Sequence, residues 1–552
     1  MKKVVSIIVI IVIFIFLCNF VLLPTIDYSK LDYVSYSRLS HQSLNYLQDE
    51  VKNPKNIIVQ LRLDYDTFNN EAYVVQTRDL IAYKKVDSQL RADAKKYHKE
   101  NNKRLTEKLV FENAQEVYVS SYSPFIEVTY DYDYFMKHEN IILSKVTTLD
   151  YVKEVILTQT FDNYQKCIDV SNDISGATEV YENRTKTGEG IVVGVLENGL
   201  VDDDHPNLAH TTVTRRASIY NITGDDEHTT EMALIIAGEN GIAPNATILS
   251  AFLYGTMSAE VDWMIDHGVD IINMSYGDVP NQGIYSNESA YADYICYTYN
   301  VIMVASAGNT NGMVYNPGLG YNVITVGGVQ CDMEKAPFSS CMVEEGPRKP
   351  TISALGCQVD LYDDDGTSIS GTSPAAALVS GYIALLLEDY PDLAADKGRL
   401  IALMCVSAGY NTNYQIFDAD NGFDYGIGAG VFNYSNMIEN YETSFVYRNE
   451  SKLLNELVCQ KMIFAQTGNV IRACVANMAK TTGTKSSLLM TDYDVFLYDF
   501  SGNLLTYSNS YQDVVDILTY TATKSGYYYM KIYQCSNRVD PVETLGYAYS
   551  VN

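Results

Sequence analysis

Short apolar runs alternate with helical stretches through the middle of the chain. Residues 191–196 form a continuous apolar run, which is typical of a strand buried on both faces of a parallel sheet. Similar strands are expected at 247–253, 270–274, 301–305 and 322–327, with helices at 230–238, 258–268 and 289–299. This alternation predicts an α/β fold on a doubly wound parallel sheet, in which active residues gather where strands end.

The two outer regions have different patterns. Residues 24–165 are polar and rich in Tyr and Lys, and they indicate a small α+β unit. After about residue 443 the helical patterns stop, and short apolar segments between Gly-containing turns predict an all-β sandwich. Strands are expected at 56–63, 124–129, 152–157, 493–500, 504–508, 513–521 and 527–534, and a long polar helix at 79–107. The expected domains are 1–23, 24–165, 170–442 and 443–552.

An apolar run near the start of the sequence predicts export. Val4–Leu23 is interrupted only by Ser6, Cys18 and Asn19, and two lysines precede it. Such a run is a signal peptide or an uncleaved signal anchor, and its length can span a bilayer once. Because no clear small-x-small motif follows, the sequence favours a single N-terminal membrane anchor over a cleaved signal. In both cases we expect the body to be secreted or held at the cell surface.

The net charge excludes one class of partner. The formal net charge is −29, and the acidic residues are spread along the chain. Such a surface repels nucleic acid and anionic lipid head groups, so neither is an expected partner.

The cysteines are compatible with a few disulfides in an oxidising compartment. Nine follow Cys18, an odd number. Cys331 and Cys341 flank a short polar segment and are candidates for a pair. A second pair is expected within the C-terminal group Cys459, Cys474 and Cys535.

Metal-binding patterns are weak. The sequence has no CxxC and no HExxH, so it predicts no zinc site. Several acidic segments leave calcium open as a ligand, against the alternative of solvated acidic turns. These segments are Asp202–Asp204, Asp363–Asp365 and the acidic turns of the C-terminal region.

One serine stands where a nucleophile is expected. Ser373 follows Gly371 and Thr372 and stands just before Ala375–Glu388, a run that predicts a buried helix. The free N–H groups and the dipole at a helix N-terminus favour a developing anion, as a serine nucleophile requires. The alternative is a serine that only caps a core helix.

Three further polar residues lie at the expected strand and helix ends. Glu197 ends the first buried strand, Asn309 follows another, and His228 lies just before an apolar helix. These groups and Ser373 fit acyl transfer by a serine–histidine–carboxylate system. His228 would take the proton from Ser373, and Glu197 would orient the imidazole. The Asn309 side chain and the Ser373 backbone N–H would bind the oxyanion.

Over about residues 175–435 the chain resembles the subtilisin-like serine peptidases. The likeness lies in the order of the four groups (acid, histidine, asparagine, serine) and in the residues around each of them. The resemblance rests on the segments Val195–Gly199 with His205–Leu208, His228–Ala233 with Gly241–Pro244, Asp262–Gly277, Ser306–Asn309, and Gly371–Ser373 with Gly381. It implies a subtilisin-like fold, serine endopeptidase activity on proteins or peptides, and no required cofactor. The implied catalytic residues are Glu197, His228, Asn309 and Ser373, and the implied substrate-binding residues are Ser275, Tyr276, Gly277 and Gly308.

The outer regions resemble attachments of the same family. Residues 50–158 look like its inhibitory prodomain, which implies a zymogen whose own prodomain is a partner. Residues 492–498 and 526–529 are similar to β-sandwich domains appended to secreted bacterial peptidases.

Four positions depart from the family pattern. Glu197 stands in place of aspartate, Thr229 in place of glycine, and Glu231 in place of a second histidine; Ala377 replaces the proline four residues after the nucleophile. These departures motivate a second hypothesis, a peptidase-shaped surface protein that binds without turnover. An esterase or lipase with the same triad is a third, but the Gly-x-Ser-x-Gly elbow of those enzymes is absent from this site.

Ser370 is the alternative nucleophile. It lies four residues before Pro374, which matches the serine-to-proline spacing of the family. It follows Ile369 rather than a Gly-Thr pair, so the sequence favours Ser373.

Overall fold

The computed structural model describes residues 56–63, 83–106, 109, 111–121, 123–149, 151–160, 186–217, 224–277, 282–330, 332–357, 359–360, 368–409, 422–450 and 455–552. The expected membrane anchor, the Asp363–Asp365 run and Cys331 lie outside these ranges. Among the described residues, no helix is long and apolar enough to cross a membrane. The chain divides into two compact units, residues 1–74 with 94–164 and residues 75–93 with 165–552.

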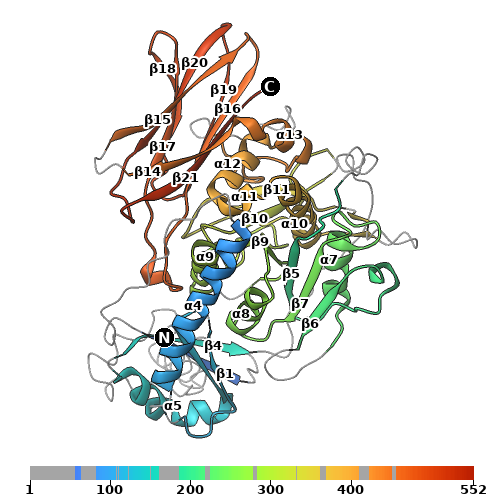
Figure 1. Cartoon of the computed structure of the whole chain (residues 1–552), viewed down its shortest axis with the longest axis vertical. Coiled ribbons are helices and arrows are strands. Elements are labelled where there is room, and N and C mark those ends of the chain that lie inside the picture. Colours follow the sequence, from blue (N-terminus) through green and yellow to red (C-terminus); the bar gives the residue numbers. More distant parts are fainter. Residues whose placement is uncertain are drawn as a thin grey trace, which may run out of the picture. The chain divides into compact units, whose positions relative to one another are not determined.

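The first unit contains the expected α+β structure (Figure 1). Its antiparallel sheet has the order β2-β3-β1-β4. The elements of this part of the chain are β1 (Asn56–Leu63), α4 (Tyr83–Thr106), β2 (Glu116–Val119), β3 (Phe125–Asp131), α5 (Tyr132–Thr147) and β4 (Val152–Thr160). The sheet and α5 enclose a core of their own, in which Phe135 and Leu143 are fully buried.

The second unit contains the predicted doubly wound sheet. Its seven strands have the order β11-β10-β9-β8-β5-β7-β6, and all neighbouring pairs are parallel. They are β5 (Val192–Glu197), β6 (Val213–Arg216), β7 (Thr247–Phe252), β8 (Ile271–Met274), β9 (Ile302–Ser306), β10 (Ile324–Val329) and β11 (Ile352–Leu355). After β5 the chain first forms the edge strand β6 and then returns to β7, which lies between β6 and β5. It next forms β8 on the other side of β5 and continues outward to β11. The point where the strand order reverses therefore lies between β5 and β8.

Helices cover both faces of this sheet. On one face, α7 and α10 contact each other and share a buried cluster with β5. On the other face, Met264 of α8 lies against Gly194, where the absence of a side chain permits the close approach. The main helices are α7 (Glu227–Ala237), α8 (Ser258–Asp266), α9 (Asn287–Tyr299), α10 (Thr372–Asp389), α11 (Asp392–Ala395), α12 (Lys397–Ser407) and α13 (Tyr434–Glu439), with 3-10 turns at Pro206–Leu208, Tyr441–Thr443 and Lys485–Ser487. A two-stranded pairing of β12 (Val359–Asp360) and β13 (Ser368–Ile369) leads into α10.

Two of these helices begin earlier than the apolar pattern predicts. Asp226 caps α7 by accepting a hydrogen bond from the backbone N–H of Thr229, so His228 lies within the first turn. Helix α10 begins at Thr372 after Gly371, so Ser373 is its second residue. The first turns of both helices are polar, and the periodicity of apolar residues does not detect polar turns. This explains both differences.

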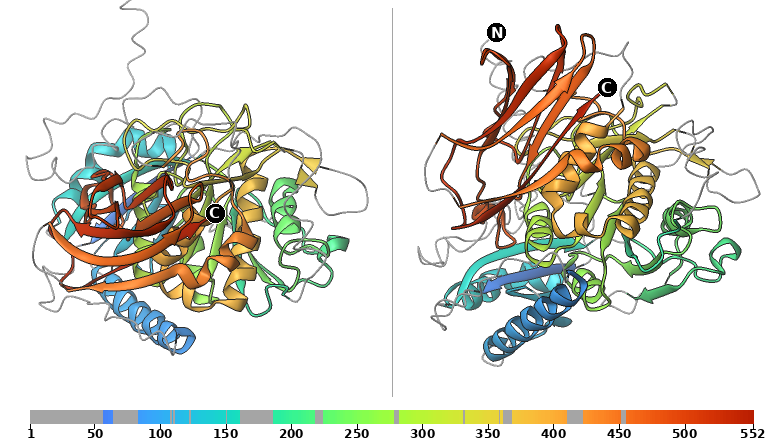
Figure 2. Two further views of the ribbon diagram at one scale, coloured as in Figure 1. Left: turned by 90° about the horizontal axis from the view of Figure 1, so that it is seen from above. Right: turned by 45° about the horizontal axis from the view of Figure 1, so that its top comes forward.

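The C-terminal region is the predicted β-sandwich (Figure 2). One antiparallel sheet has the order β14-β21-β16-β19 and the other β15-β20-β17-β18. The strands are β14 (Ser444–Asn449), β15 (Glu456–Ala465), β16 (Val470–Ala476), β17 (Tyr493–Asp499), β18 (Leu504–Ser508), β19 (Val515–Thr521), β20 (Gly526–Gln534) and β21 (Glu543–Val551). The first sheet packs on α12, and some of its buried residues, such as Cys474 and Ala548, belong to the same apolar cluster as those of α10. Others, such as Ile471 and Tyr547, belong to a separate core within the sandwich.

The expected disulfide within the C-terminal group of cysteines is absent. Cys459, Cys474 and Cys535 all carry free thiols, as does Cys341. Cys474 lies in β16 of one sheet and joins the core shared with α12, whereas Cys459 lies in β15 of the other sheet. Cys459 is opposite Ile532 in the strand pairing, and Cys535 follows the end of that strand. The fold therefore keeps these three cysteines at separate positions.

Candidate active site

The predicted acid, amide and substrate-binding segment gather at one edge of the parallel sheet. Glu197 is the last residue of β5, Ser275 follows β8, and Asn309 lies three residues beyond β9. These three strands are neighbours in the sheet, and parallel strands present their carboxyl ends at the same edge. The site therefore lies at the reversal of strand order, where α/β sheets bind their ligands.

The carboxylate of Glu197 is buried between two partners. Its side chain lies 3.7 Å from His228, measured from Oε2 to Nδ1. Its other oxygen, Oε1, accepts a hydrogen bond from the backbone N–H of Ser275 at 2.9 Å. Burial raises the pKa of Glu197 well above its usual value, the Ser275 N–H opposes this rise, and the charge of Asp226 adds to it. Because Nδ1 faces the carboxylate, the other ring nitrogen of His228, Nε2, points away from Glu197.

Ser373 lies in the same cluster through Ser275. The Ser373 hydroxyl donates a hydrogen bond to the Ser275 carbonyl oxygen at 3.1 Å, and the Ser275 hydroxyl donates to the Ser373 carbonyl oxygen at 3.1 Å. Ser275 thus connects the carboxylate to the serine through its backbone N–H, its carbonyl and its hydroxyl. The sequence indicated Ser275 only as a substrate-binding residue. Its bridging role was missed because two of its three contacts are made by backbone atoms, which leave no sequence pattern.

Asn309 is fixed by the start of α10. Its Oδ1 accepts hydrogen bonds from the backbone N–H of Thr372 at 2.8 Å and from the Thr372 hydroxyl at 2.9 Å. The same hydroxyl accepts from the backbone N–H of Gly308 at 3.0 Å. A Cβ at position 371 would lie 3.3 Å from the Asn309 Nδ2, so the glycine there leaves space for the amide. With Oδ1 engaged, the Nδ2 donor is the group that remains for a ligand.

Two glycines of the predicted substrate-binding set lie against one aromatic ring. A Cβ on Gly277 would come within 2.4 Å of the Tyr315 ring, and one on Gly308 within 3.0 Å. Gly308 also has a φ of +107°, a conformation that side chains rarely adopt. The neighbouring Tyr276 donates its hydroxyl hydrogen to Glu288 at 3.2 Å. The absence of side chains at these two glycines therefore makes room for the Tyr315 ring.

The calcium hypothesis finds little support at Asp202–Asp204. Asp203 forms an ion pair with Arg215, which also pairs with Asp225. Asp202 accepts a hydrogen bond from the backbone N–H of Asp204 at 3.1 Å, as in a solvated acidic turn. Among the described residues, the one group of three or more acidic, Cys or His side chains with metal-ligand spacing lies elsewhere, in the β-sandwich.

A serine at a helix N-terminus, an imidazole beside a buried carboxylate and a strand-end amide are the groups of an acyl-transfer centre on a parallel α/β sheet. A model of the subtilase family matches residues 188–430. The chain is 30% identical to subtilisin DY of Bacillus licheniformis over 237 residues, which are 38% of this chain and 82% of that protein. The chain therefore belongs to the subtilase family of serine endopeptidases.

Other relatives match a similar share of the chain. The chain is 26% identical to subtilisin E and to serine protease AprX, both of Bacillus subtilis strain 168, over 228 and 286 residues. These matches cover 37% and 42% of this chain, and only 57% and 64% of the two relatives. Among solved structures, fervidolysin from Fervidobacterium pennivorans is similar with a TM-score of 0.47 at 17% identity, over 86% of this chain and 70% of that one. The prenylagaramide maturation protease PagA is similar with a TM-score of 0.39 at 23% identity, over 48% and 98%.

Proposed function

We propose that this chain is an exported serine endopeptidase that uses Ser373, His228 and Glu197 as its triad and Asn309 as an oxyanion donor. The observation that carries the proposal is the contact of 3.7 Å between the His228 Nδ1 and the buried Glu197 carboxylate. That contact orients the imidazole and stabilises its cation, which is the role of the acid in such a triad.

The chemistry follows from the groups at the sheet edge. The Ser373 Oγ attacks the carbonyl carbon of the scissile peptide bond, and its proton passes to the Nε2 of His228. His228 then gives this proton to the leaving amine as the C–N bond breaks, and an ester on Ser373 remains. Water hydrolyses the ester by the same proton relay in reverse. The Asn309 Nδ2 and the Ser373 backbone N–H stabilise the negative oxygen in both steps.

The Ser373 hydroxyl must turn before it reacts. It donates to the Ser275 carbonyl oxygen, and the reaction requires it to donate to His228 instead. A rotation about the Cα–Cβ bond exchanges one acceptor for the other, and side-chain rotations of this kind are fast. We propose that substrate binding along Ser275–Gly277 favours the reactive rotamer, since the same backbone would then pair with the peptide.

Export and maturation belong to the same proposal. The apolar run Val4–Leu23 supports delivery across a membrane, either as a cleaved signal or as a single anchor. The α+β unit formed around β1 to β4 is the candidate inhibitory prodomain. Its removal would convert a zymogen to a peptidase outside the cytoplasm.

Hydrolysis of a quenched fluorescent peptide library tests the proposal. We expect Ser373→Ala to abolish hydrolysis, while Ser370→Ala retains most of it, because Ser370 lies outside helix α10. Both variants remove one hydroxyl from the same segment, so the second controls for folding. Loss of activity in Ser370→Ala alone would move the nucleophile to Ser370. A well-folded parent that binds peptides but hydrolyses none would favour the binding-protein hypothesis.

A further inference from the structure

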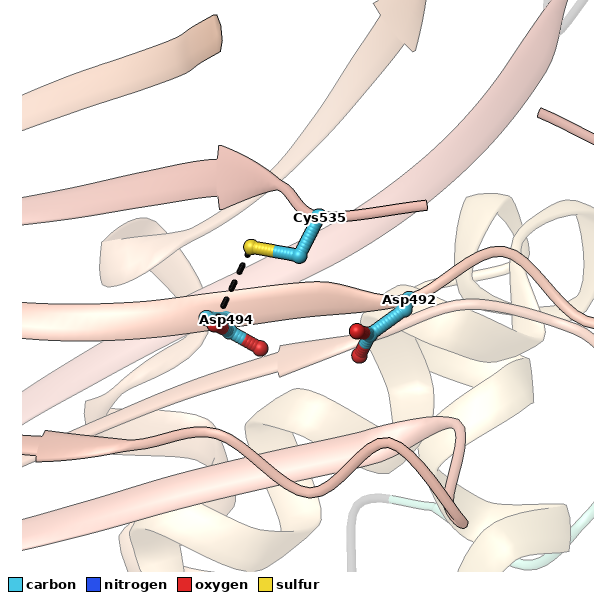
Figure 3. A group of neighbouring side chains, drawn as sticks. All are labelled: Asp492, Asp494 and Cys535. Carbon is cyan, nitrogen blue, oxygen red and sulfur yellow. Dashed lines mark hydrogen bonds between the residues drawn. The ribbon is translucent and has the colours of Figure 1, made fainter. Parts of the chain in front are cut away.

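The second sheet of the β-sandwich brings three potential metal ligands together, far along the chain from the candidate active-site residues. Asp492 and Asp494 lie on either side of the first residue of β17, and Cys535 directly follows β20. These two strands are antiparallel neighbours, with Tyr493 opposite Gln534. One ligand atom from each of the three side chains lies within 4.8 Å of the other two. Figure 3 shows both carboxylates and the thiol gathered at this end of the strands.

The polar atoms of this cluster have unmet bonding capacity. Asp494 is 8% exposed, and its Oδ2 accepts a hydrogen bond from the Cys535 thiol at 3.0 Å. The other oxygen of Asp494 and the Oδ1 of Asp492 are both buried and have no hydrogen-bond partner. In the part of the chain that the structure describes, neither carboxylate forms an ion pair. Two adjacent carboxylates whose buried oxygens have no partner are unfavourable when both are charged, so their arrangement points to a bound positive charge.

The backbone around the cluster is held in place. The backbone N–H of Cys535 donates to the Asp492 carbonyl at 2.8 Å, and the N–H of Asp492 donates to the Ser536 hydroxyl at 2.8 Å. Tyr493 turns to the other side of the strand, where its hydroxyl contacts Asn449 and Glu543. The alternation of side chains along β17 therefore places both carboxylates on one side, beside the thiol.

We infer that Asp492, Asp494 and Cys535 bind a thiophilic divalent cation of the zinc class. Zn²⁺ accepts Cys sulfur at about 2.3 Å and carboxylate oxygen at about 2.0–2.2 Å, which places its ligand atoms within roughly 4.5 Å of one another. A sulfur ligand disfavours Ca²⁺ and Mg²⁺, which take oxygen ligands. Three protein ligands leave a fourth tetrahedral position for water, and the partial exposure of Asp492 and Cys535 lets solvent reach it.

Binding requires loss of the thiol proton. The hydrogen bond from the Cys535 thiol to Asp494 is replaced by bonds from the metal to the thiolate and the carboxylate, and the proton passes to solvent. The ion would then tie the start of β17 to the end of β20 and stabilise this sheet. The absence of CxxC and HExxH gave no sign of this site, because Asp494 and Cys535 are 41 residues apart in sequence and meet only through strand pairing.

Titration of the reduced, metal-free full chain with Co²⁺ tests the inference. Co²⁺ reports thiolate ligation through a charge-transfer band and four-coordination through its visible bands. We expect one equivalent of Co²⁺ to give both signals and Zn²⁺ to displace them. Asp494→Asn should weaken Zn²⁺ binding at least about 10-fold. Removing a residue that only hydrogen-bonds to a metal ligand already costs about that much affinity, so removing a ligand should cost no less. Cys535→Ser should remove the charge-transfer band.

Cys459→Ser is the matched control. Cys459 is a second free thiol on the same sheet, partly buried on β15 and outside the cluster. The Cys459→Ser variant should leave the cobalt spectrum and the rise in Tm with Zn²⁺ unchanged. Circular dichroism verifies that all variants are folded. A parent chain that shows no stoichiometric band would overturn the inference. Equal competition by Ca²⁺ would also overturn it, because it would indicate a site made of oxygen ligands alone.

Discussion

At the scale of single residues, the contacts of Glu197 support its proposed role as the acid of the triad. One oxygen of its carboxylate accepts the Ser275 N–H at 2.9 Å, and the other lies 3.7 Å from the His228 Nδ1. The additional methylene lets one side chain at the end of β5 face both the backbone after β8 and the first turn of α7. We therefore interpret the length of the Glu197 side chain as matched to the position of β5.

Shortening this acid tests that interpretation. Aspartate at position 197 cannot keep both contacts without movement of β5, so Glu197→Asp should lower kcat. Glu197→Gln keeps the length but removes the charge that stabilises the imidazolium, and we expect a loss approaching ~10⁴ in kcat. Steady-state kinetics on one peptide substrate measure both. A faster Glu197→Asp enzyme would show that the glutamate is a degraded aspartate, and two variants equal to the parent would remove position 197 from the triad.

The same burial makes a prediction about stability and pH. Because the pKa of Glu197 is raised in the folded chain, the folded state binds a proton that the unfolded state releases once the pH exceeds the usual glutamate pKa. Stability contributed at this position therefore falls as the pH rises. In a Ser373→Ala background, which prevents self-digestion, the Tm gain from Glu197→Gln should grow between pH 4 and pH 8. A gain that shrinks over this range would contradict the assigned direction.

At the scale of elements, apolar periodicity predicted the centre of the parallel sheet and missed several other elements. The five central strands of the parallel sheet appear where their apolar runs lie, because burial on both faces requires such runs. Strand β6 was missed, since its sequence Val-Thr-Arg-Arg is partly exposed throughout. The mostly buried strands β11 and β16 were also missed. The sequence also placed Ser373 and His228 outside their helices, because Thr372 and Glu227 begin those helices with polar turns.

The contact of α10 with the segment after α7 is tight at one glycine. A Cβ on Gly381 would lie 2.6 Å from the Ile242 Cβ, and in both residues these atoms are fixed to the backbone. Overpacking of a core costs about 1–3 kcal/mol, so Gly381→Ala should lower the urea midpoint of unfolding. Gly224→Ala is the control, because nothing lies within 4 Å of the added atom. Equal urea midpoints for both variants would mean that α10 can move away from Ile242 at no cost in stability.

At the scale of the whole molecule, the subtilase part and the β-sandwich share one core. Arg472 of β16 is fully buried, and its guanidinium donates to the Ala408 carbonyl at 2.9 Å and the Ala429 carbonyl at 2.6 Å. Gly398 of α12 and Gly546 of β21 allow the helix to approach the sheet closely. The sequence predicted a sandwich but not this shared core, because contacts between distant segments leave no local pattern. The three-ligand cluster on β17 and β20 escaped sequence reasoning for the same reason.

Maturation is the prediction that belongs to this scale. The α+β unit ends with β4 at Thr160, and the parallel sheet begins at Val192. If the first unit is an inhibitory prodomain, the chain should cut itself within about residues 155–175, and Ser373→Ala made without other peptidases should remain uncut. Intact-mass measurement of both proteins distinguishes the outcomes. An unprocessed chain with full activity would exclude the zymogen hypothesis.

The central claim is that Ser373 is the nucleophile, and the position of a covalent adduct tests it most directly. The folded parent chain is treated with a serine-directed fluorophosphonate, digested, and sequenced by tandem mass spectrometry. We predict one phosphonylated residue, Ser373, with no modification after the site is blocked by a competing peptide aldehyde. An adduct on Ser370, or no adduct on a folded chain that still hydrolyses peptides, would contradict the account.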